Sequence, residues 1–383
     1  MATQHTSLAL ARARWLPPIE EAMRRAISAR VSTGLTPQPP FPTREGGLLD
    51  RAGVPFGDPP SRLAPGAPGH YGMMRYHLGW ANERLEPADA PTGKRLRPLI
   101  ALIVAEAFGA SVAHALPVAV ALELLHNFTL VHDDIEDGDA RRHHRPTLWA
   151  LWGEAQAINA GDGMHVLAHL ALLDAAGAGV AAEVVVALAR RFAEASLIVT
   201  EGQHLDLAFT GRDAVSVGAY LDMIARKSAA LIACAAAMGA EVARAPAEVV
   251  LAMQSFGHAL GLGFQVRDDV LGMWGSPEAT GKPTSDLARR KKTLPTLYAL
   301  GRASEADRRA ISTVLDADAS APPDGASLGA AQAAIDRSGA RRHCESLVAR
   351  YSLEAREHLG VLPLGSARQA LEELVAMLED RDR

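Results

Sequence analysis

Cysteine is scarce in this chain. Only Cys234 and Cys344 occur among 383 residues, and neither lies in a spacing typical of metal ligands. Two distant cysteines exclude a disulfide framework and fit a reducing compartment. The first residues also lack a basic segment followed by an apolar core, so no signal peptide is expected. The sequence therefore predicts a cytoplasmic protein.

Long uninterrupted apolar runs are also absent. The most apolar stretch, around 101–125, is broken by Glu106, His114, Pro117 and Glu123. Such a pattern is typical of a buried helix, and we expect no integral membrane segment. The net charge is only -5, which gives no electrostatic reason to expect a nucleic-acid partner.

Alternating β-branched residues are few, whereas alanine and leucine are abundant. Because these two are good helix formers, the sequence predicts an all-α protein. Residues 1–70 are expected to form a short helix over about 17–30 and then a proline- and glycine-rich loop, partly disordered, over 36–69. Residues 71–383 are expected to form the catalytic domain, with a second loop over 319–327.

Two aspartate-rich stretches dominate what is present. Asp133, Asp134 and Asp137 lie within one helical turn of each other, and Asp268 and Asp269 form a second cluster. Each close pair of like charges costs roughly 4 kcal/mol at an effective dielectric constant of about 20, so cations must neutralise the clusters. Oxygen ligands favour Mg²⁺, which takes one or two carboxylates and fills its other positions with water and substrate phosphates. The two clusters therefore predict a metal-bridged phosphate ester.

One cluster alone is explained equally well as a solvated charged face. Both clusters, however, follow apolar helix, the first after Leu130-Val131-His132 and the second after Gly263-Phe264-Gln265-Val266-Arg267. Carboxylates at the mouth of a buried cavity are expected to follow such segments.

Basic and amide side chains accompany the clusters. Lys94 and Arg97 are expected to point together at an anion, although a solvated basic turn is the plainer alternative. Arg141 and Arg142 follow the first cluster, and arginine forks suit phosphate oxygens. His126 lies two turns before Asp133, where an ordinary core histidine is the alternative. The remaining weak signals are Gln203 with Asp206, Lys227-Ser228, Gly281-Lys282 and Lys291.

Taken together and in order, these stretches resemble the trans-isoprenyl diphosphate synthases of the polyprenyl synthetase family, of the short-chain geranylgeranyl or farnesyl type. The resemblance covers about residues 70–300. It rests on Gly93-Lys94-Arg95-Leu96-Arg97-Pro98, His126, Asp133 to Asp137 with Arg141-Arg142, Gly202-Gln203 with Asp206, Lys227-Ser228, Phe264-Gln265 with Asp268-Asp269, and Gly281-Lys282 through Lys291.

The resemblance implies the isoprenoid synthase fold, with antiparallel helices around a central apolar cavity, and a homodimer. It implies that an allylic diphosphate and isopentenyl diphosphate are the substrates. Asp133 and Asp137 would hold two Mg²⁺ ions and Asp268 a third, with Asp134 and Asp269 completing the two metal motifs.

Roles for the other matching residues follow from the same resemblance. The implied ligands of the allylic diphosphate or the nascent cation are Arg141, Lys227, Gln265, Lys282 and Lys291; those of isopentenyl diphosphate are Lys94, Arg97, His126 and Arg142; Gln203 belongs to the substrate-binding set. The Lys227 carbonyl, the Ser228 hydroxyl and the Gln265 amide oxygen would stabilise an allylic carbocation.

Two features bear on specificity. Gly272 stands where the family usually has a third aspartate, and weaker metal binding is expected from it; an aspartate introduced there is expected to be tolerated. Phe128 and Thr129, one turn before the first cluster, are expected to meet the growing chain, with Phe128 as its floor. Because Thr129 is small, geranylgeranyl diphosphate (C20) is favoured, with farnesyl diphosphate as runner-up. An ordinary core role for Phe128 is the alternative.

Two other functions compete with a synthase. A class I terpene cyclase shares the first acidic cluster, but its second metal motif is typically of the Asn-Asp, Ser, Glu type. A non-catalytic prenyltransferase subunit usually loses several acidic residues, whereas all five aspartates remain here.

Overall fold

The computed structural model describes residues 6–32, 69–91, 93–210, 215–275, 286–317 and 323–379. The expected loop over 36–69 lies outside these residues, apart from Gly69, and so does Lys282. Nearly all described secondary structure is helical, which confirms the all-α prediction.

The elements follow one another with short connections. The first part of the chain contains α1 (Ser7–Ser32), α2 (His70–His77), α3 (Leu96–Ala107), α4 (Val112–Glu136), the short strands β1 (Arg141–Arg142) and β2 (Arg145–Pro146), and α5 (Leu148–Trp152). The middle contains α6 (Glu154–Gly177), α7 (Ala182–Thr210), α8 (Val217–Ile224), the π-helical turn η1 (Ala225–Ala229), α9 (Ala230–Val242) and α10 (Ala247–Trp274). The last part contains α12 (Leu294–Arg302), α13 (Glu305–Leu315), α14 (Gly325–Arg337), α15 (Ala340–His358), the 3-10 turn η2 (Leu359–Val361) and α16 (Ser366–Glu379).

Packing divides the chain into two compact units. Unit 1 comprises Met1–Ile19, Lys94–His126 and Ala168–Arg383, and unit 2 comprises Glu20–Gly93 and Asn127–Leu167. Three of the four boundaries fall within α1, α4 and α6, and the fourth lies between Gly93 and Lys94, before α3. The first acidic motif belongs to unit 2 and the second to unit 1, so each is described within its own unit.

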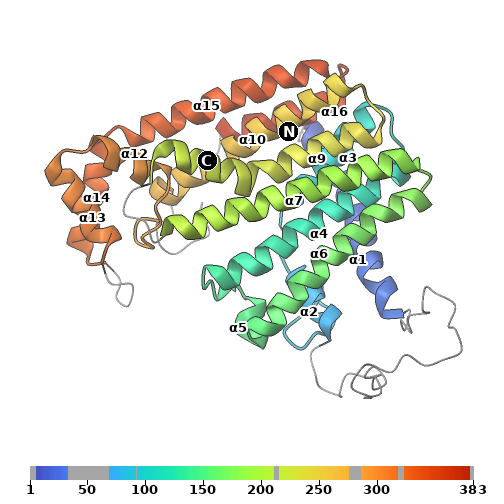
Figure 1. The fold of residues 1–383 in the computed structure, drawn as a ribbon, viewed down its shortest axis with the longest axis horizontal. Coiled ribbons are helices and arrows are strands. Elements are labelled where there is room, and N and C mark those ends of the chain that lie inside the picture. Colours follow the sequence, from blue (N-terminus) through green and yellow to red (C-terminus); the bar gives the residue numbers. More distant parts are fainter. Residues whose placement is uncertain are drawn as a thin grey trace, which may run out of the picture. The chain divides into compact units, whose positions relative to one another are not determined.

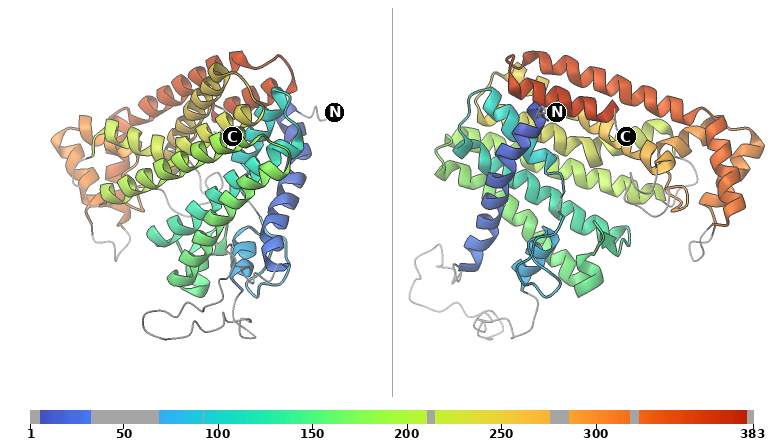
Figure 2. Two further views of the ribbon diagram at one scale, coloured as in Figure 1. Left: turned by 45° about the vertical axis from the view of Figure 1, so that its right-hand side comes forward. Right: turned by 180° about the vertical axis from the view of Figure 1, so that it is seen from behind.

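Unit 1 is built around α9 and α10. Helix α10 packs against α9 and α15, and α3 and α7 pack against α9 (Figure 1). The close approach of α10 to α9 and to η1 depends on glycine. A β-carbon on Gly257 would lie 2.5 Å from the Ile232 carbonyl oxygen of α9, and one on Gly261 would lie 2.5 Å from Ala229 Cα of η1. Helices α15 and α16, red in Figure 2, lie side by side in both views.

In unit 2, the β1–β2 hairpin is tied to α2 through one tyrosine. The Tyr76 hydroxyl donates to the Pro146 carbonyl at 2.9 Å. Arg145 in turn donates to the carbonyls of Tyr76 at 2.9 Å and Ala81 at 2.7 Å, and its guanidinium lies 4.0 Å from the centre of the Tyr76 ring. Arg145 is therefore a structural residue that orients the hairpin.

Helix α1 is longer than the sequence predicted, since it begins at Ser7 instead of near residue 17. The predicted apolar face is confirmed, because Ile19, Met23 and Ile27 are fully buried. Each such side chain stabilises the fold by about 1.5–3 kcal/mol relative to an exposed one.

Three helical stretches in the described part of the chain are, by length and composition alone, sufficient to cross a membrane. They are Val112–Glu136, Val217–Val242 and Ala247–Trp274. Of their most apolar windows, 61%, 72% and 56% respectively are buried inside the protein. Most of this apolar surface therefore already packs within the fold.

Candidate active site

The first acidic motif lies at the C-terminal end of helix α4. The Asp137 amide donates to the Asp133 carbonyl at 2.9 Å, so the helical turn continues one residue beyond Glu136. The prediction that Asp133 and Asp137 lie one turn apart on a helix is confirmed. Asp133 is half-buried and Asp137 is exposed, whereas Asp134 is buried. The three carboxylates therefore do not share one environment.

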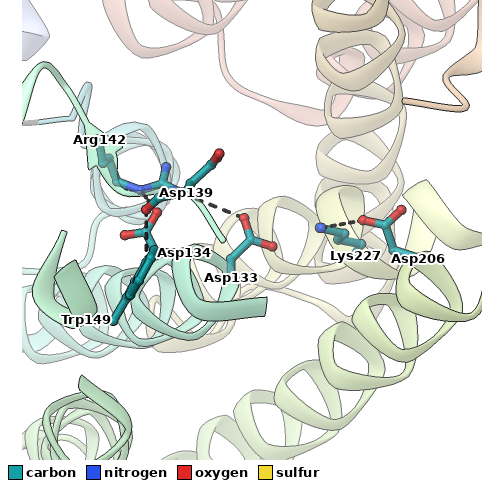
Figure 3. Close-up of polar contacts among 7 residues, drawn as sticks. All are labelled: Asp133, Asp134, Asp139, Arg142, Trp149, Asp206 and Lys227. Carbon is teal, nitrogen blue, oxygen red and sulfur yellow. Dashed lines mark hydrogen bonds and ion pairs between the residues drawn. The ribbon is translucent and has the colours of Figure 1, made fainter. Parts of the chain in front are cut away.

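A hairpin arginine neutralises this motif from within unit 2. Arg142 Nε donates to Asp134 Oδ1 at 2.8 Å, and Arg142 Nη2 lies 3.7 Å from Asp133 Oδ2 (Figure 3). Burial raises the pKa of Asp134 to about 6, against the opposing effect of Arg142. The hairpin turn uses His143 and His144, both with positive φ (49° and 64°), as its geometry requires.

The three arginines after the first acidic motif have different surroundings. Arg142 contacts the motif, Arg145 anchors the hairpin, and Arg141 is exposed. The loop itself is held by Trp149, whose Nε1 donates to the Asp139 carbonyl at 3.0 Å (Figure 3).

The second acidic motif lies inside α10, as predicted. Asp268 is exposed, and Asp269 is buried among donors. Asp269 accepts hydrogen bonds from the Tyr220 hydroxyl at 2.7 Å, from Gln265 Nε2 at 3.1 Å and from the Leu294 amide at 3.3 Å. Burial nevertheless raises the pKa of Asp269 to about 7. Asp269 is thus held by protein partners, while Asp268 faces solvent.

Lys227 and Ser228 lie on the π-helical turn η1, which the sequence analysis did not predict. In it, the Ala230 amide donates to the Ala225 carbonyl, five residues back. Lys227 Nζ donates to Asp206 Oδ2 at 2.6 Å (Figure 3), and the Ser228 hydroxyl donates to Gln265 Oε1 at 2.7 Å. Such turns occur often at functional sites.

The packing of this turn explains Gly202. A β-carbon at Gly202 would lie 2.2 Å from the Lys227 backbone nitrogen. Only glycine lets α7 approach the turn so closely, and this approach brings Asp206 to the Lys227 ammonium.

The basic residues at the start of α3 also differ from one another in burial and in partners. Arg95, with φ of 49°, is buried and pairs with buried Glu123 at 2.8 Å. Arg97 is half-buried, and its Nε atom is enclosed without a hydrogen-bond partner. Desolvation lowers the pKa of Arg97 to about 10, although Glu123 opposes the shift. Lys94 is exposed and His126 is half-buried.

Gly272 adjoins a carboxylate from elsewhere in the chain. A β-carbon there would lie 1.9 Å from Asp286 Oδ2, and the Asp286 amide donates to the Gly272 carbonyl at 2.9 Å. A side chain at this position must displace the Asp286 carboxylate, so tolerance of an aspartate there stays a prediction that depends on whether Asp286 can move.

For the remaining predicted residues, the structure gives burial but does not assign a role. Gln203, Lys291, Phe128 and Thr129 are half-buried. In the described parts of the chain, no three His, Cys, Asp or Glu side chains gather closely enough to hold a metal ion by themselves.

Sequence reasoning assigned no role to Tyr220 or Asp286. Tyr220 lies in no recognised motif, and its contact with Asp269 joins residues 49 positions apart. Asp286 closes the stretch Gly281-Lys282-Pro283-Thr284-Ser285-Asp286, and its place in that stretch was the available signal.

Comparison with known proteins identifies the family. A family model described as polyprenyl synthetase matches residues 80–327. The chain belongs to the polyprenyl synthetase family.

Several members of this family are similar over most of the chain. A (2E,6E)-farnesyl diphosphate synthase of Mycobacterium tuberculosis is 43% identical over 75% of this chain and 77% of its own length. A geranylgeranyl diphosphate synthase of the same organism is 45% identical over 61% of this chain and 66% of its own length.

Solved structures agree with this assignment. A polyprenyl synthetase from Streptomyces coelicolor A3(2) has a TM-score of 0.75 and 36% identity, and the match covers 82% of this chain and 92% of that one. A polyprenyl synthase from Caulobacter crescentus, crystallised with calcium and isoprenyl diphosphate, has a TM-score of 0.73 and 26% identity over 97% of both chains. This polyprenyl synthetase therefore has the isoprenoid synthase fold and is a trans-prenyltransferase of the short-chain type.

Proposed function

We propose that this polyprenyl synthetase joins an allylic diphosphate to isopentenyl diphosphate head to tail, with release of pyrophosphate. The observation that carries this proposal is the enclosed, unpartnered Nε of Arg97 at the start of α3. A buried cation with an unused donor is costly unless a ligand supplies an acceptor, and a diphosphate does so. Exposed Lys94 and half-buried His126 complete the proposed isopentenyl diphosphate site.

The carboxylates suit a divalent cation that the substrate helps to bind. Asp133, Asp137 and Asp268 offer oxygen ligands at accessible or half-accessible positions, and the described residues hold no ready-made protein cage. Mg²⁺ binds in this way, through one or two carboxylates with water and phosphate oxygens. The resemblance groups Asp134 and Asp269 with the metal ligands; because both are buried and bonded to protein partners, we propose instead that they orient the two motifs. The calcium and isoprenyl diphosphate bound to the Caulobacter relative support a divalent-metal site, and three Mg²⁺ ions are proposed.

Bound Mg²⁺ would neutralise the charge that develops on the departing diphosphate. Side chains of the protein are proposed to bind the diphosphate and to stabilise the carbocation. Lys227, Arg141, Lys282 and Lys291 are proposed to bind the allylic diphosphate, with Gln203 in the substrate-binding set. When the allylic C–O bond breaks, its electron pair stays with the diphosphate and a delocalised carbocation remains.

Ser228 and Gln265 are proposed to stabilise that cation with their side-chain oxygens. Because the Ser228 hydroxyl donates a hydrogen bond to Gln265 Oε1, the lone pairs of the serine oxygen stay available to a positive charge. The Lys227 carbonyl is the third proposed oxygen. The double bond of isopentenyl diphosphate then forms the new C–C bond, and the proton lost in this step passes to the released pyrophosphate.

For product length we propose C20, with C15 as the alternative. Phe128 as floor and the small Thr129 beside it favour the longer product. The Mycobacterium relatives support both lengths, because one is named a farnesyl and the other a geranylgeranyl diphosphate synthase.

We also propose a homodimer in the cytoplasm. Val186 and Leu197 share one face of α7, and their side chains are 67% and 61% exposed. The resemblance to the family supports the homodimer, and these two exposed residues mark the face of α7 to be examined. Light scattering of the purified protein measures whether the particle has twice the mass of the chain.

One incubation tests the reaction. The purified chain is mixed with Mg²⁺, labelled isopentenyl diphosphate and, separately, dimethylallyl, geranyl or farnesyl diphosphate, and the products are sized. We expect chain-extended diphosphates that reach hexane only after phosphatase treatment. Excess chelator should abolish the activity.

Matched variants identify the metal motifs. Asp133→Asn and Asp268→Asn should lower turnover by several orders of magnitude, whereas Glu136→Gln, on the last turn of α4, should not. Hydrocarbon products without phosphatase would indicate a terpene cyclase. An inactive but folded wild-type chain would indicate a non-catalytic subunit, and full activity in chelator would exclude the metal assignment.

A further inference from the structure

A carboxylate from outside α10 lies where a side chain of α10 is missing. A β-carbon built on Gly272 would have three atoms of Asp286 as its nearest neighbours outside its own helical turn. They are Oδ2 at 1.9 Å, Cγ at 2.6 Å and Oδ1 at 3.3 Å. The Asp286 carboxylate therefore lies in the space that the first atoms of a side chain at position 272 would fill.

Backbone hydrogen bonds and core packing hold Asp286 at this place in unit 1. Its amide donates to the Gly272 carbonyl at 2.9 Å, and its carbonyl accepts from the Lys291 amide at 2.9 Å. Leu287 and Met273, the residues that follow Asp286 and Gly272 in the chain, are buried in one apolar cluster. Asp286 itself is only 5% exposed. The position of its carboxylate is thus set by the fold around it.

Position 272 would complete a spacing that the first acidic motif has in full. That motif has two aspartates one helical turn apart, and on α10 the residue one turn after Asp268 is Gly272. Side chains with this spacing are neighbours on a helix surface, with β-carbons about 5–6 Å apart. The charge of Asp286 also acts on the motif: burial is the main cause of the raised pKa of Asp269, and Asp286 adds to it. A carboxylate in the place of residue 272 is therefore close to both aspartates of the motif.

We propose that Asp286 supplies the second acidic motif with the carboxylate that Gly272 lacks. This inference rests on the proposed synthase function, which assigns a divalent cation to that motif. Exposed Asp268 is the direct ligand, whereas buried Asp286 is a positioning residue that acts through its negative charge and through water on the cation. The glycine makes room for this carboxylate, so Gly272 and Asp286 form one functional unit.

The test begins with removal of the carboxylate. The full chain is heated with a fixed concentration of inorganic pyrophosphate and increasing Mg²⁺, and the readout is the Mg²⁺ concentration that gives half of the maximal rise in unfolding temperature. Asp286→Ala and Asp286→Asn should raise this concentration by about 10- to 100-fold, the loss typical when a partner of a metal ligand is removed. Asp286→Asn keeps the shape of the side chain and therefore isolates the effect of its charge.

Two double variants then return a side chain from α10. In Gly272→Asp/Asp286→Ala the carboxylate is attached to the helix, and the Mg²⁺ requirement should return to near the wild-type value. In Gly272→Asn/Asp286→Ala a side chain of the same size carries no charge, and the requirement should stay high. Both should fold, because the atoms nearest to the new β-carbon belong to the Asp286 side chain that is removed. The Mg²⁺ concentration for half-maximal turnover should follow the same order.

The outcomes separate this inference from the function on which it rests. Thermal unfolding in chelator shows which variants fold. An unchanged Mg²⁺ requirement in folded Asp286→Asn overturns the role of Asp286, and so does a folded Gly272→Asp/Asp286→Ala without rescue. Equal rescue by the two double variants also overturns it, because the space would then need filling but no charge. A wild-type chain that makes no prenyl diphosphate refutes the proposed function itself.

Discussion

At the residue scale, adjacent aspartates in each acidic motif have different environments. Asp134 and Asp269 are buried and bonded to protein partners, whereas their neighbours Asp133 and Asp268 are half-buried and exposed, respectively. Neighbouring residues on a helix point about 100° apart, so one of two adjacent side chains faces the interior. The pair of motifs thus combines carboxylates that position the helix with carboxylates that are accessible to a ligand.

The buried Asp269 predicts a pH-dependent stability in the absence of metal. Its pKa in the folded protein is about 7, raised by burial from 3.8, so over this range the native state holds a proton that the unfolded chain has released. Stability should therefore fall as the pH rises from about 4 to about 7, by up to about 1.4 kcal/mol per pH unit from this group. Asp269→Asn removes the titration.

Urea unfolding of both proteins at pH 5 and pH 7, in chelator, measures this effect. The free energy of unfolding of the wild type should fall relative to that of Asp269→Asn between the two pH values. A constant difference would show that Asp269 does not carry a raised pKa.

At the element scale, the π-helical turn η1 joins three helices of unit 1. Its Lys227 bonds to Asp206 on α7, and its Ser228 bonds to Gln265 on α10, which in turn bonds to Asp269. Tyr220 on α8 contacts the same Asp269 carboxylate. A shift of this turn would therefore move both a proposed diphosphate ligand and the support of the second acidic motif.

Gly202→Ala tests this coupling. The new β-carbon would lie 2.2 Å from a backbone nitrogen that cannot rotate away, so α7 and the turn must separate. Overpacking of this kind costs about 1–3 kcal/mol, and turnover should fall as Lys227 moves from Asp206. Gly301→Ala on α12 is the control, since no heavy atom lies within 4 Å of its β-carbon.

Thermal unfolding and turnover of the two variants provide the comparison. Gly301→Ala should leave the stability unchanged or raise it, because alanine has a higher helix propensity than glycine. An equally stable and active Gly202→Ala would mean that the close approach of α7 has no importance.

At the scale of the whole molecule, the two ends of the described chain are fixed within unit 1. Glu373 on α16 accepts hydrogen bonds from the amides of Ser7 at 3.0 Å and Leu8 at 2.8 Å, at the start of α1. Buried Arg267, directly before Asp268, donates to the carbonyls of Leu378 at 2.7 Å and Glu379 at 3.3 Å. The end of α16 is thus tied to the helix that carries the second acidic motif.

Glu373→Ala should release the start of α1. The carboxylate serves as a helix cap supplied from a distant part of the chain, and loss of such a cap costs about 0.5–2 kcal/mol. Glu372→Ala is the control, because Glu372 pairs with Arg368 on its own helix at a partly exposed position. Urea unfolding measures both, and the idea fails if the two variants lose the same stability.

The sequence by itself determined the features that depend on neighbours along the chain. Alanine- and leucine-rich segments predicted helices, the spacing of Asp133 and Asp137 predicted their single turn, and Ile19, Met23 and Ile27 predicted a buried face. These predictions succeeded because helical periodicity and local hydrogen bonding act over a few residues. The ordered motifs likewise sufficed to identify the family.

Only the tertiary structure decided which member of each motif performs which role. It placed Arg95 on Glu123 and left Arg97 Nε enclosed, turned Asp134 towards Arg142, and placed Asp286 beside Gly272. These choices depend on which side chains the fold places beside each charge to desolvate it or to pair with it. Adjacent residues of the same type are equivalent in sequence, and only the packing of helices distant in the chain makes them different.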